Sequence, residues 1–550
     1  MLDGLMQRTP LQIIGILNHA AVAHGEREIV SRLVDEPIWR YTYAEMSRRV
    51  AQAAHMLREL GVRPGSRVSS LAWNTHRHLE LFYATPGIGS VLHTANPRLS
   101  DDQIVYTITH AGSEVLFFDK TFSSMVARIR PRLSGVRTFV ALSEKWNLEA
   151  NLTVASSYEE LLTRQKSSYE WPVFDENAAA FLCYTSGTTG HPKGVLYSHR
   201  SVVLHSLAAG LAGALGFSAF DCIMPCQSLY HATAWGLPFV APINGCKLVL
   251  PCEKMDGASL HELITTEGVT FSGGVPTIWT TYLAYLEQCG GNTASLKQLV
   301  IGGSAVPRAM AETFLRKYGV EVRQIWGMTE TSPLGVIATP TPKLAAKGEN
   351  LTEETIWTKQ GRLQFGIELR VVDEERRDVP RDGKTPGTLL VRGPWTIERY
   401  FGDDKSAVDA AGWFDTGDIA TLDDDGFMRI TDRQKDVIKS GGEWISSIDL
   451  ENIAVACPGV RIAAVIGAYH PKWEERPILV VEPHPECAVT ADQVREFLEP
   501  RIVRWWSPDA IIIATIPLTA TGKIDKKSLR DKYKGYLINT RKYGAHSEPK

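Results

Sequence analysis

The sequence has little net charge and no long apolar run, and each absence excludes a class of protein. Its 550 residues carry a formal net charge of −3, which gives no general electrostatic reason to bind nucleic acid or an anionic membrane. The longest candidate for a membrane span, residues 207–220, contains three glycines and is too short to cross a bilayer. The first residues lack the basic-then-apolar layout of a secretory signal. We therefore expect a soluble, cytoplasmic protein that binds no nucleic acid and has no transmembrane segment.

Cysteine motifs are also missing. The eight cysteines are dispersed along the chain, and no Cys-x-x-Cys or Cys/His cluster has the spacing of a zinc site. Even the closest pair, Cys222 and Cys226, has three residues between its members. Reduced and mostly buried thiols are therefore expected, which suits a cytosolic compartment.

What the sequence does contain is an alternation of strand-length apolar runs with segments of helical period. The apolar runs include residues 67–73, 114–119, 178–184, 247–250 and 298–301, and the helical segments include 43–60, 260–266 and 307–318. This alternation predicts an α/β fold with layers built around largely buried sheets. A chain of this length is expected to form two or more domains.

The character of the sequence changes in its last third. The polar stretch 341–361 is interpreted as a surface excursion, and short strands and turns follow it. Beyond residues 432–436 lies a compact remainder that is large enough for a small domain. We therefore expect an N-terminal domain at 1–434 and a C-terminal domain at 435–550.

A run rich in Thr, Ser and Gly follows the apolar segment 178–184. It comprises Thr185, Ser186, Gly187, Thr188, Thr189, Gly190, His191, Pro192 and Lys193. Glycines allow backbone N–H groups to turn toward an anion, hydroxyl groups add donors, and Lys193 supplies a mobile positive charge. The spacing excludes the Walker motif of P-loop NTPases, because only two residues separate Gly187 from Gly190 and the lysine follows a proline. The run therefore predicts a loop that binds the phosphates of a nucleotide.

Five motifs in order resemble those of the acyl-adenylate-forming superfamily, which includes acyl-CoA synthetases, luciferases and peptide-synthetase adenylation domains. They are Tyr184–Gly194, Trp326–Glu330, Gly412–Asp418, Asp432–Trp444 and Pro517–Lys523. The resemblance extends over nearly the whole chain. It implies a large N-terminal AMP- and acyl-binding domain of several layered subdomains and a small, mobile α+β C-terminal domain with its hinge at Lys435. It also implies an AMP-forming carboxylate–CoA ligase that uses ATP, Mg²⁺ and CoA.

The resemblance assigns roles to individual residues. Lys523 is expected to lie between the carboxylate and the α-phosphate, where it would reduce the negative charge that develops during adenylation. Asp415 is expected to accept hydrogen bonds from the ribose hydroxyls, with Arg433 as its cationic neighbour. The expected catalytic set is Lys523, Thr185, Glu330 and His231.

The remaining implied contacts lie in short segments. Besides the Thr185–Lys193 run, the nucleotide is expected to meet Gly303, Ser304, Ala305, Gln324, Ile325, Trp326, Gly327, Met328 and Thr329. Mg²⁺ is expected at Thr185 and Glu330, because a hard cation prefers oxygen ligands. The pantetheine arm of CoA is expected to pass Lys439, Gly441, Gly442, Glu443 and Trp444.

The choice of acid is expected to depend on a pocket with aromatic walls. Its expected residues are His231, Trp235, Gly302, Trp326 and Pro333. His231 stands where amino-acid-activating relatives carry an aspartate for the substrate ammonium, which argues against an α-amino acid. The two tryptophans would shorten an acyl channel and favour a small-to-medium apolar acid. A packed His231 without substrate contact, and tryptophans that belong mainly to the core, are equally open interpretations.

Within the family, the runs His199–Ser201, Trp326–Pro333 and Lys439–Ser446 are most similar to bacterial medium-chain fatty acid–CoA ligases and 3-methylmercaptopropionate–CoA ligases. An arylalkanoate–CoA ligase is an alternative. A luciferase-like adenylator or a non-catalytic acyl or nucleotide sensor would be a different class, although the intact set of polar motif residues argues against a sensor. Many relatives are homodimers, and by this analogy alone a homodimer is expected for the present chain.

Overall fold

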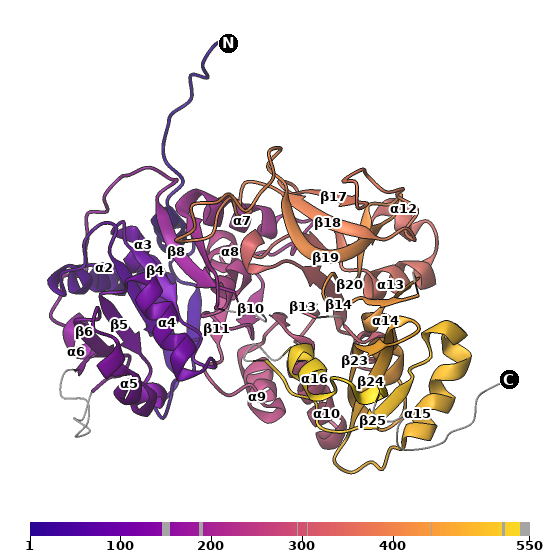
Figure 1. Ribbon diagram of the computed structural model, residues 1–550. Helices are drawn as coiled ribbons and strands as arrows, with labels where there is room; N and C mark the ends of the chain where they lie inside the picture. Colours follow the sequence, from indigo (N-terminus) through magenta and orange to yellow (C-terminus); the bar gives the residue numbers. More distant parts are fainter. Residues whose placement is uncertain are drawn as a thin grey trace.

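The computed structural model describes residues 1–145, 155–185, 191–293, 295–304, 306–441, 443–519 and 523–538. A large N-terminal domain and a smaller C-terminal domain form a mixed α/β fold, with the C-terminal domain at the lower right of Figure 1. The predicted fold class is therefore confirmed. Within the described ranges, no helix is both long enough and apolar enough to span a bilayer.

The first sheet has the strand order β7-β6-β5-β3-β4-β8-β9. Its strands are β3 (Arg67–Leu71), β4 (Val91–Thr94), β5 (Val115–Phe118), β6 (Thr138–Ala141), β7 (Ala155–Ser157), β8 (Ala179–Tyr184) and β9 (Gly194–Ser198). The helices around it are α1 (Ile13–Ala23), α2 (Tyr43–Glu59), α3 (His76–Gly87), α4 (Asp101–Ala111), α5 (Ser123–Ile129) and α6 (Tyr158–Leu162).

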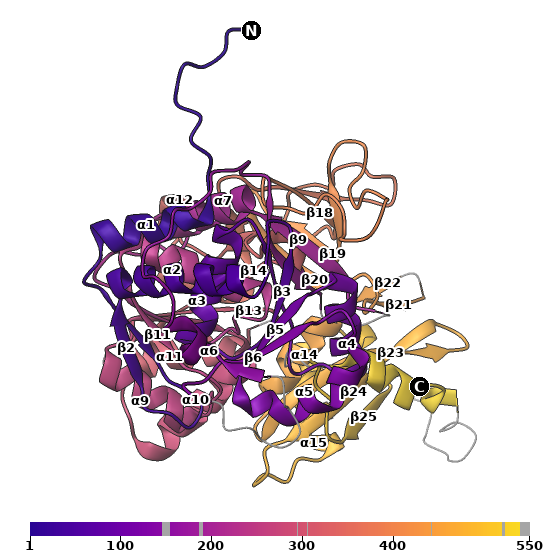
Figure 2. The same cartoon turned by 90° about the vertical axis from the view of Figure 1, so that its left-hand side faces the viewer.

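Side chains of β5 show how this sheet is covered on both faces. Successive strand residues point to opposite faces, so Val115 and Phe117 pack in the core shared with α2 and α3, whereas Leu116 and Phe118 pack with α4 and α5. Figure 2 shows these two helix pairs on either side of the sheet. The last two strands, β8 and β9, pair antiparallel and bracket the Thr/Ser/Gly run.

The second sheet is the largest and has the order β17-β18-β19-β20-β16-β15-β14-β13-β12-β10-β11-β1-β2. Its strands are β1 (Glu28–Ser31), β2 (Trp39–Thr42), β10 (Cys222–Pro225), β11 (Lys247–Leu250), β12 (Phe271–Gly274), β13 (Gln298–Gly302), β14 (Glu321–Trp326), β15 (Val336–Ile337), β16 (Gly361–Leu363), β17 (Glu368–Val372), β18 (Gly387–Arg392), β19 (Phe414–Leu422) and β20 (Phe427–Arg433).

Helices also cover both faces of this sheet in its parallel part. One face packs Leu299 and Ile301 with helices α9 (Gly257–Glu267), α10 (Pro276–Cys289) and α11 (Arg308–Tyr318). The other face turns Phe271 and Val300 toward α7 (His199–Gly210) and α8 (Leu237–Asn244). The same core contains Val115 and Phe117 of the first sheet. The two sheets and the helices between them therefore form one packed unit.

The C-terminal domain is built on a smaller sheet with the order β22-β21-β24-β23, in which β25 also pairs with β24. Its elements are β21 (Ile438–Ser440), β22 (Glu443–Ile445), α14 (Ser447–Val455), β23 (Val460–His470), β24 (Glu474–Pro483), α15 (Ala491–Leu498), β25 (Ala510–Ile513) and α16 (Lys526–Lys532). Helices α14 and α15 cover one face and α16 covers the other. The Asp432 carboxylate joins this domain to β20, because Oδ2 accepts a hydrogen bond from the Ser447 N–H at 2.7 Å.

The polar stretch 341–361, interpreted from the sequence as a surface excursion, is mostly exposed up to residue 354. It forms the helices α12 (Pro342–Ala345) and α13 (Glu349–Thr358), which the sequence analysis did not predict. Ile356 and Trp357 of α13 are 5% exposed and pack in the core that faces α11. The few apolar residues among many charges are therefore enough to dock this segment on the sheet.

Candidate active site

The connection between β8 and β9 is the predicted phosphate loop. Its residues Ser186, Gly187, Thr188, Thr189 and Gly190 lie outside the described ranges. The ends of the loop are joined, because the Thr185 N–H donates to the Lys193 carbonyl oxygen at 2.9 Å and the Lys193 N–H donates to Thr185 Oγ1 at 3.2 Å. The exposed Lys193 ammonium lies 4.6 Å from the centre of the Tyr400 ring. The hairpin therefore fixes Thr185 and leaves the lysine accessible.

The short helix η4 (Thr329–Thr331) places a buried carboxylate near this loop. Glu330 is 6% exposed, and its Oε1 accepts a hydrogen bond from the Tyr400 hydroxyl at 2.8 Å. Burial raises the pKa of Glu330, while the Tyr400 hydrogen bond and the charges of Arg433 and Lys193 act in the opposite direction. A bound cation would favour the ionised form of this carboxylate.

A second buried carboxylate joins three strands of the large sheet. Asp418 of β19 is 1% exposed. Its Oδ1 lies 2.7 Å from Arg433 Nε, and its Oδ2 accepts a hydrogen bond from Trp326 Nε1 at 2.8 Å. Asp418 and Arg433 are cross-strand partners in the β19–β20 pair, so the strand register itself brings them together. The sequence motifs contain all three residues but did not show this arrangement.

Asp415, the expected ribose ligand, is less buried and has a different partner from the one expected. Its Oδ2 lies 3.0 Å from Arg376 Nη2, and its Oδ1 accepts a hydrogen bond from the Gly417 N–H at 3.1 Å. Arg433 forms its ion pair with Asp418 instead. Arg433 Nη1 also donates to the carbonyl oxygen of Thr416, the residue after Asp415, and its role as the cationic neighbour of Asp415 at the ribose stays a prediction.

Lys523 reaches the large domain from the C-terminal domain. A Cβ atom placed on Gly303 would lie 3.6 Å from Lys523 Cε, so the lysine side chain runs along the turn that follows β13. Burial lowers the pKa of Lys523 to about 8, and the positive charge of Arg433 adds to this shift, whereas the carboxylates of Asp418 and Glu330 oppose it. The candidate catalytic lysine thus lies among the nucleotide-site residues predicted from the sequence.

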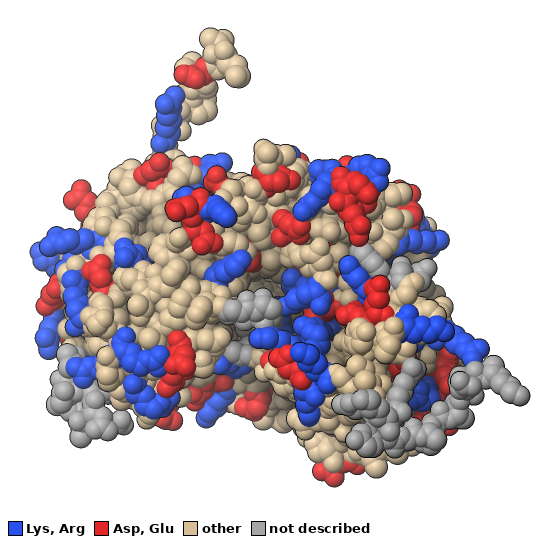
Figure 3. Space-filling view, in the orientation of Figure 1, with Lys and Arg blue, Asp and Glu red and all other residues tan. Residues whose placement is uncertain are grey.

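Positive side chains also gather at the surface around this region. In the view of Figure 3, Lys and Arg residues border the hollow between the two domains. Such a border favours the approach of a polyanion, because charges that line a concave surface focus the electrostatic potential.

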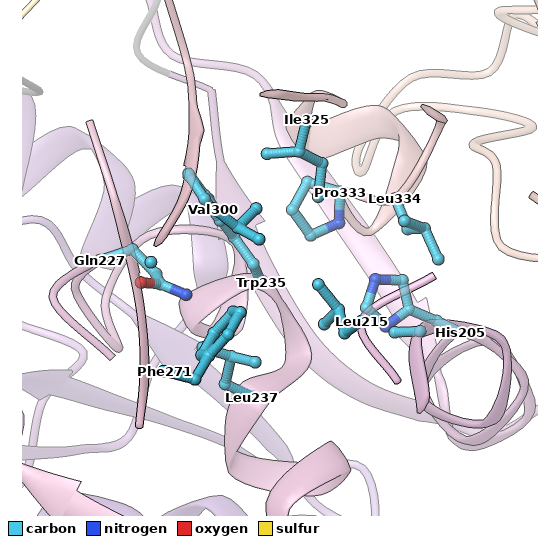
Figure 4. Close-up of a pocket in the computed structure, with 12 residues that line it drawn as sticks. His205, Leu215, Gln227, Trp235, Leu237, Phe271, Val300, Ile325, Pro333 and Leu334 are labelled. Atoms are coloured by element: carbon cyan, nitrogen blue, oxygen red, sulfur yellow. The ribbon is translucent and has the colours of Figure 1, made fainter. Parts of the chain in front are cut away.

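An apolar cavity lies between the large sheet and α7 and α8 (Figure 4). Its lining includes His205, Ala209, Leu215, Gln227, Trp235, Leu237, Phe271, Gly273, Val300, Ile325, Pro333 and Leu334. Trp235 and Pro333 were predicted as substrate residues, and both belong to this lining. Gly302 lies next to it, because a Cβ there would be 3.4 Å from Trp235 Cη2.

Trp326, also predicted as a pocket wall, is directed elsewhere. Its indole donates to Asp418, and a Cβ on Gly335 would lie 2.4 Å from the Trp326 ring. The neighbouring Ile325 lines the cavity instead. Adjacent residues of a strand point to opposite faces, and a buried indole N–H requires an acceptor. Of the two interpretations of Trp326, the structure therefore supports the one in which its ring belongs to the core, and Ile325 lines the cavity.

His231 lines a second cavity rather than the apolar one. This cavity is also bounded by His93, Tyr184 and Thr185, so it opens next to the end of the phosphate loop. Burial lowers the pKa of His231 to about 4, and the Lys523 charge contributes to the shift. At neutral pH the imidazole is therefore uncharged.

Several predicted contacts are either turned away or not described. The Gln324 side chain donates to the Trp357 carbonyl oxygen and accepts from Gln360 Nε2 at 3.1 Å, so its amide points to the α13 side of the sheet. Gly327 is packed against the Pro333 carbonyl group. Ala305 and Gly442 lie outside the described residues.

The predicted CoA segment forms the β21–β22 hairpin of the C-terminal domain. The Gly441 N–H donates to the Trp473 carbonyl oxygen at 2.9 Å, and the Lys439 N–H donates to Glu475 Oε2 at 3.0 Å. Both contacts are made within the C-terminal domain. In this structure the segment that carries Lys523, rather than this hairpin, supplies the contact with Gly303.

Comparison with known proteins identifies the family. The model for "AMP-binding enzyme" matches residues 17–401, and the model for "AMP-binding enzyme C-terminal domain" matches residues 449–523. The chain belongs to the AMP-binding enzyme family. It is 46% identical to 3-methylmercaptopropionyl-CoA ligase of Ruegeria lacuscaerulensis, covering 97% of this chain and 99% of the relative.

Two further relatives of this AMP-binding enzyme have a similar level of identity. Medium-chain-fatty-acid–CoA ligase of Ectopseudomonas oleovorans is 44% identical over 98% of both chains. Long-chain-fatty-acid–CoA ligase of Thermus thermophilus is 45% identical over 96% of this chain and 97% of the relative. Among solved structures, the anthranilate CoA ligase AuaEII with anthranoyl-AMP has a TM-score of 0.85 and 24% identity, covering 97% of this chain and all of that one. This likeness supports the two-domain fold.

Sequence reasoning missed residues whose importance depends on side-chain direction. Asp418 and Tyr400 contact Arg433 and Glu330, which are predicted to belong to the nucleotide site, and Arg376 pairs with Asp415. Asp418 lies inside a recognised motif, so its position was visible in the sequence although its partners were not.

The shared contacts of Asp418 predict a strong effect of Asp418→Asn. The variant removes the negative charge that pairs with Arg433 and that favours the protonated form of Lys523. The kcat/KM for ATP in the adenylation reaction should therefore fall about 10–100-fold, as for loss of a charge-assisted hydrogen bond. Glu321→Gln is the matched control, because it weakens a partly exposed ion pair with Arg323 at the end of β14 away from Trp326. Equal kcat/KM values for Asp418→Asn and the control would contradict this role.

Proposed function

We propose that this AMP-binding enzyme is an ATP-dependent carboxylate–CoA ligase. The observation that carries the proposal is the position of Lys523 beside Gly303, with Glu330 and Asp418 contributing to its electrostatic environment. In the first step, a carboxylate oxygen attacks the α-phosphorus of ATP and pyrophosphate leaves. In the second step, the CoA thiol loses its proton and attacks the acyl carbonyl, and AMP leaves.

The proposed roles follow the arrangement of the site. The loop from Thr185 to Lys193 would bind the β- and γ-phosphates, and Asp415 would accept hydrogen bonds from the ribose hydroxyls. The Lys523 ammonium would hold the α-phosphate and the carboxylate together while negative charge develops on the phosphoryl oxygens. Rotation of the domain that follows a hinge at Lys435 would then bring the β21–β22 hairpin to the site for the CoA step. We propose residues 1–434 and 435–550 as the two moving units.

We propose Mg²⁺ as the metal, held by Glu330 and the Thr185 hydroxyl. Oxygen donors suit this hard cation, and the buried Glu330 carboxylate, whose pKa is raised by burial, would be stabilised by it. The described residues contain no cluster of three or more His, Cys, Asp or Glu side chains that could hold an ion, so the phosphates would supply further ligands. When bound, the ion would neutralise phosphate charge.

We propose a small-to-medium apolar acid as the substrate, either a medium-chain fatty acid or 3-methylmercaptopropionate. The walls of the cavity formed by Trp235, Leu237 and Phe271 are apolar, and no carboxylate that could pair with an ammonium belongs to its described lining. Two relatives that share 44% and 46% identity act on these two acids by name. An arylalkanoate also suits a cavity with aromatic walls.

We also propose a cytoplasmic location and a homodimer. All eight cysteines are free, which suits a reducing compartment. The dimer rests on analogy with family members alone.

Carboxylate-dependent exchange of pyrophosphate into ATP tests the proposed function directly. Exchange with C4–C10 fatty acids or 3-methylmercaptopropionate, together with AMP and a thioester when CoA is added, is the expected result. Acetate and an α-amino acid serve as control acids, and both should give lower kcat/KM values. A lack of exchange with every acid would contradict a ligase and favour a non-catalytic sensor.

The lowered pKa of Lys523 predicts the pH dependence of adenylation. The ammonium is protonated below its pKa of about 8, so kcat/KM should fall as the pH rises through that value, well below the ordinary lysine value of 10.5. Lys523→Arg keeps its charge in this range, and its remaining activity should lack the alkaline decline. A wild-type profile that stays flat to pH 9.5 would refute the role of this proton.

A further inference from the structure

The loop between β18 and β19 is fixed to two parts of the candidate nucleotide site. Its Ile397 N–H donates to the Glu330 carbonyl oxygen at 2.7 Å, and its Phe401 N–H donates to the Gly194 carbonyl oxygen at 2.8 Å. Glu330 belongs to η4, and Gly194 directly follows Lys193 at the start of β9. Two backbone hydrogen bonds therefore hold this loop against η4 and the β8–β9 hairpin.

The side chain of Tyr400, in the same loop, contacts a charged group from each of these two parts. Its hydroxyl donates to Glu330 Oε1 at 2.8 Å, and its ring centre lies 4.6 Å from Lys193 Nζ. Burial and the Glu330 charge raise the pKa of Tyr400, so the hydroxyl stays protonated and can donate. An ammonium at this distance from an aromatic ring is attracted by its face.

These contacts define where the two charged groups lie before a nucleotide arrives. Among the described residues, Tyr400 is the only side chain that forms a hydrogen bond with the Glu330 carboxylate. Side chains that are free to rotate lose conformational entropy when a ligand orders them. Because Tyr400 already restricts both side chains, less of this entropy is lost on binding.

We propose that Tyr400 is a positioning residue, which holds the Glu330 carboxylate for Mg²⁺ and the Lys193 ammonium for the phosphates of ATP. The inference rests on the proposed ligase function and adds a residue to it. The hydroxyl acts through the carboxylate and the ring acts through the ammonium, so two substitutions separate the two contributions. Tyr400→Phe removes the hydroxyl and keeps the ring, whereas Tyr400→Leu removes both.

Calorimetric titration of the full chain with ATP, in Mg²⁺ and in EDTA, measures both contributions as equilibrium Kd values. Mg²⁺ should strengthen ATP binding to the wild-type protein. In Tyr400→Phe the gain from Mg²⁺, expressed as the ratio of the two Kd values, should fall about tenfold, as for loss of a hydrogen bond to a charged group. The Kd in EDTA should stay close to the wild-type value, because the ring still holds Lys193. In Tyr400→Leu the Kd in EDTA should also rise about threefold, as for loss of an exposed cation–π contact.

Tyr158→Phe is the matched control. The Tyr158 hydroxyl of α6 donates to Glu80 Oε2 of α3 at 2.8 Å. The control therefore loses a hydrogen bond of the same kind and length in a different part of the core, and both of its Kd values should match those of the wild-type protein.

The double variant Glu330→Gln/Tyr400→Phe distinguishes positioning from a general loss of stability. If the hydroxyl acts through the carboxylate, Tyr400→Phe should not reduce the gain from Mg²⁺ any further once Glu330 is replaced.

Three results would overturn the inference alone: an unchanged gain from Mg²⁺ in Tyr400→Phe, an equal fall in Tyr158→Phe, or additive losses in the double variant. Equal Kd values for the wild-type protein in Mg²⁺ and in EDTA would overturn the inference together with the proposed metal site. A lack of ATP binding under both conditions would overturn the ligase function as well.

Discussion

Asp418 is the carboxylate on which the geometry of the site depends, because it joins side chains from three strands. It holds the Arg433 guanidinium with one oxygen and the Trp326 indole with the other. Removing this buried carboxylate would leave the Trp326 indole N–H without its acceptor and the half-exposed Arg433 guanidinium without its ion pair. The ion pair therefore stabilises the junction of β14, β19 and β20 and also sets the electrostatic potential around Lys523.

That potential explains why a lysine from a separate domain can be stabilised beside Gly303. The carboxylates of Asp418 and Glu330 raise the pKa of Lys523, while burial and Arg433 lower it. An incoming triphosphate would add negative charge beside these cations and favour the protonated lysine further. In this account, ATP binding and the docking of the C-terminal domain stabilise one another. Thermodynamic linkage then requires that loss of pyrophosphate weakens the docking, which agrees with the proposed rotation of this domain between the two half-reactions.

The sequence predicted the elements that depend on local patterns. The apolar run before the Thr/Ser/Gly loop forms β8, and the run 298–301 lies in β13. Lys523 lies near Gly303, another residue of the predicted nucleotide site. These successes rely on periodicity and on motifs in which neighbours along the chain carry the information. The ligand contacts assigned to these residues are still predictions, since the structure concerns the protein alone.

What the sequence did not predict depends on which way side chains face across the sheets. The pairing of Arg433 with Asp418 requires the β19–β20 register, which no single segment reveals. Likewise, Ile325 rather than Trp326 lines the cavity because adjacent strand residues point in opposite directions and the indole finds its acceptor in Asp418.

Separate assays of the two half-reactions with Lys523→Ala test the central claim most directly. The account predicts that adenylation, followed by pyrophosphate exchange, falls by about 100-fold or more, as expected for loss of a charge that stabilises the transition state. Thioester formation from a supplied acyl-adenylate and CoA should stay close to the wild-type rate, because a different face of the C-terminal domain serves that step. An equal loss in both half-reactions would contradict the account.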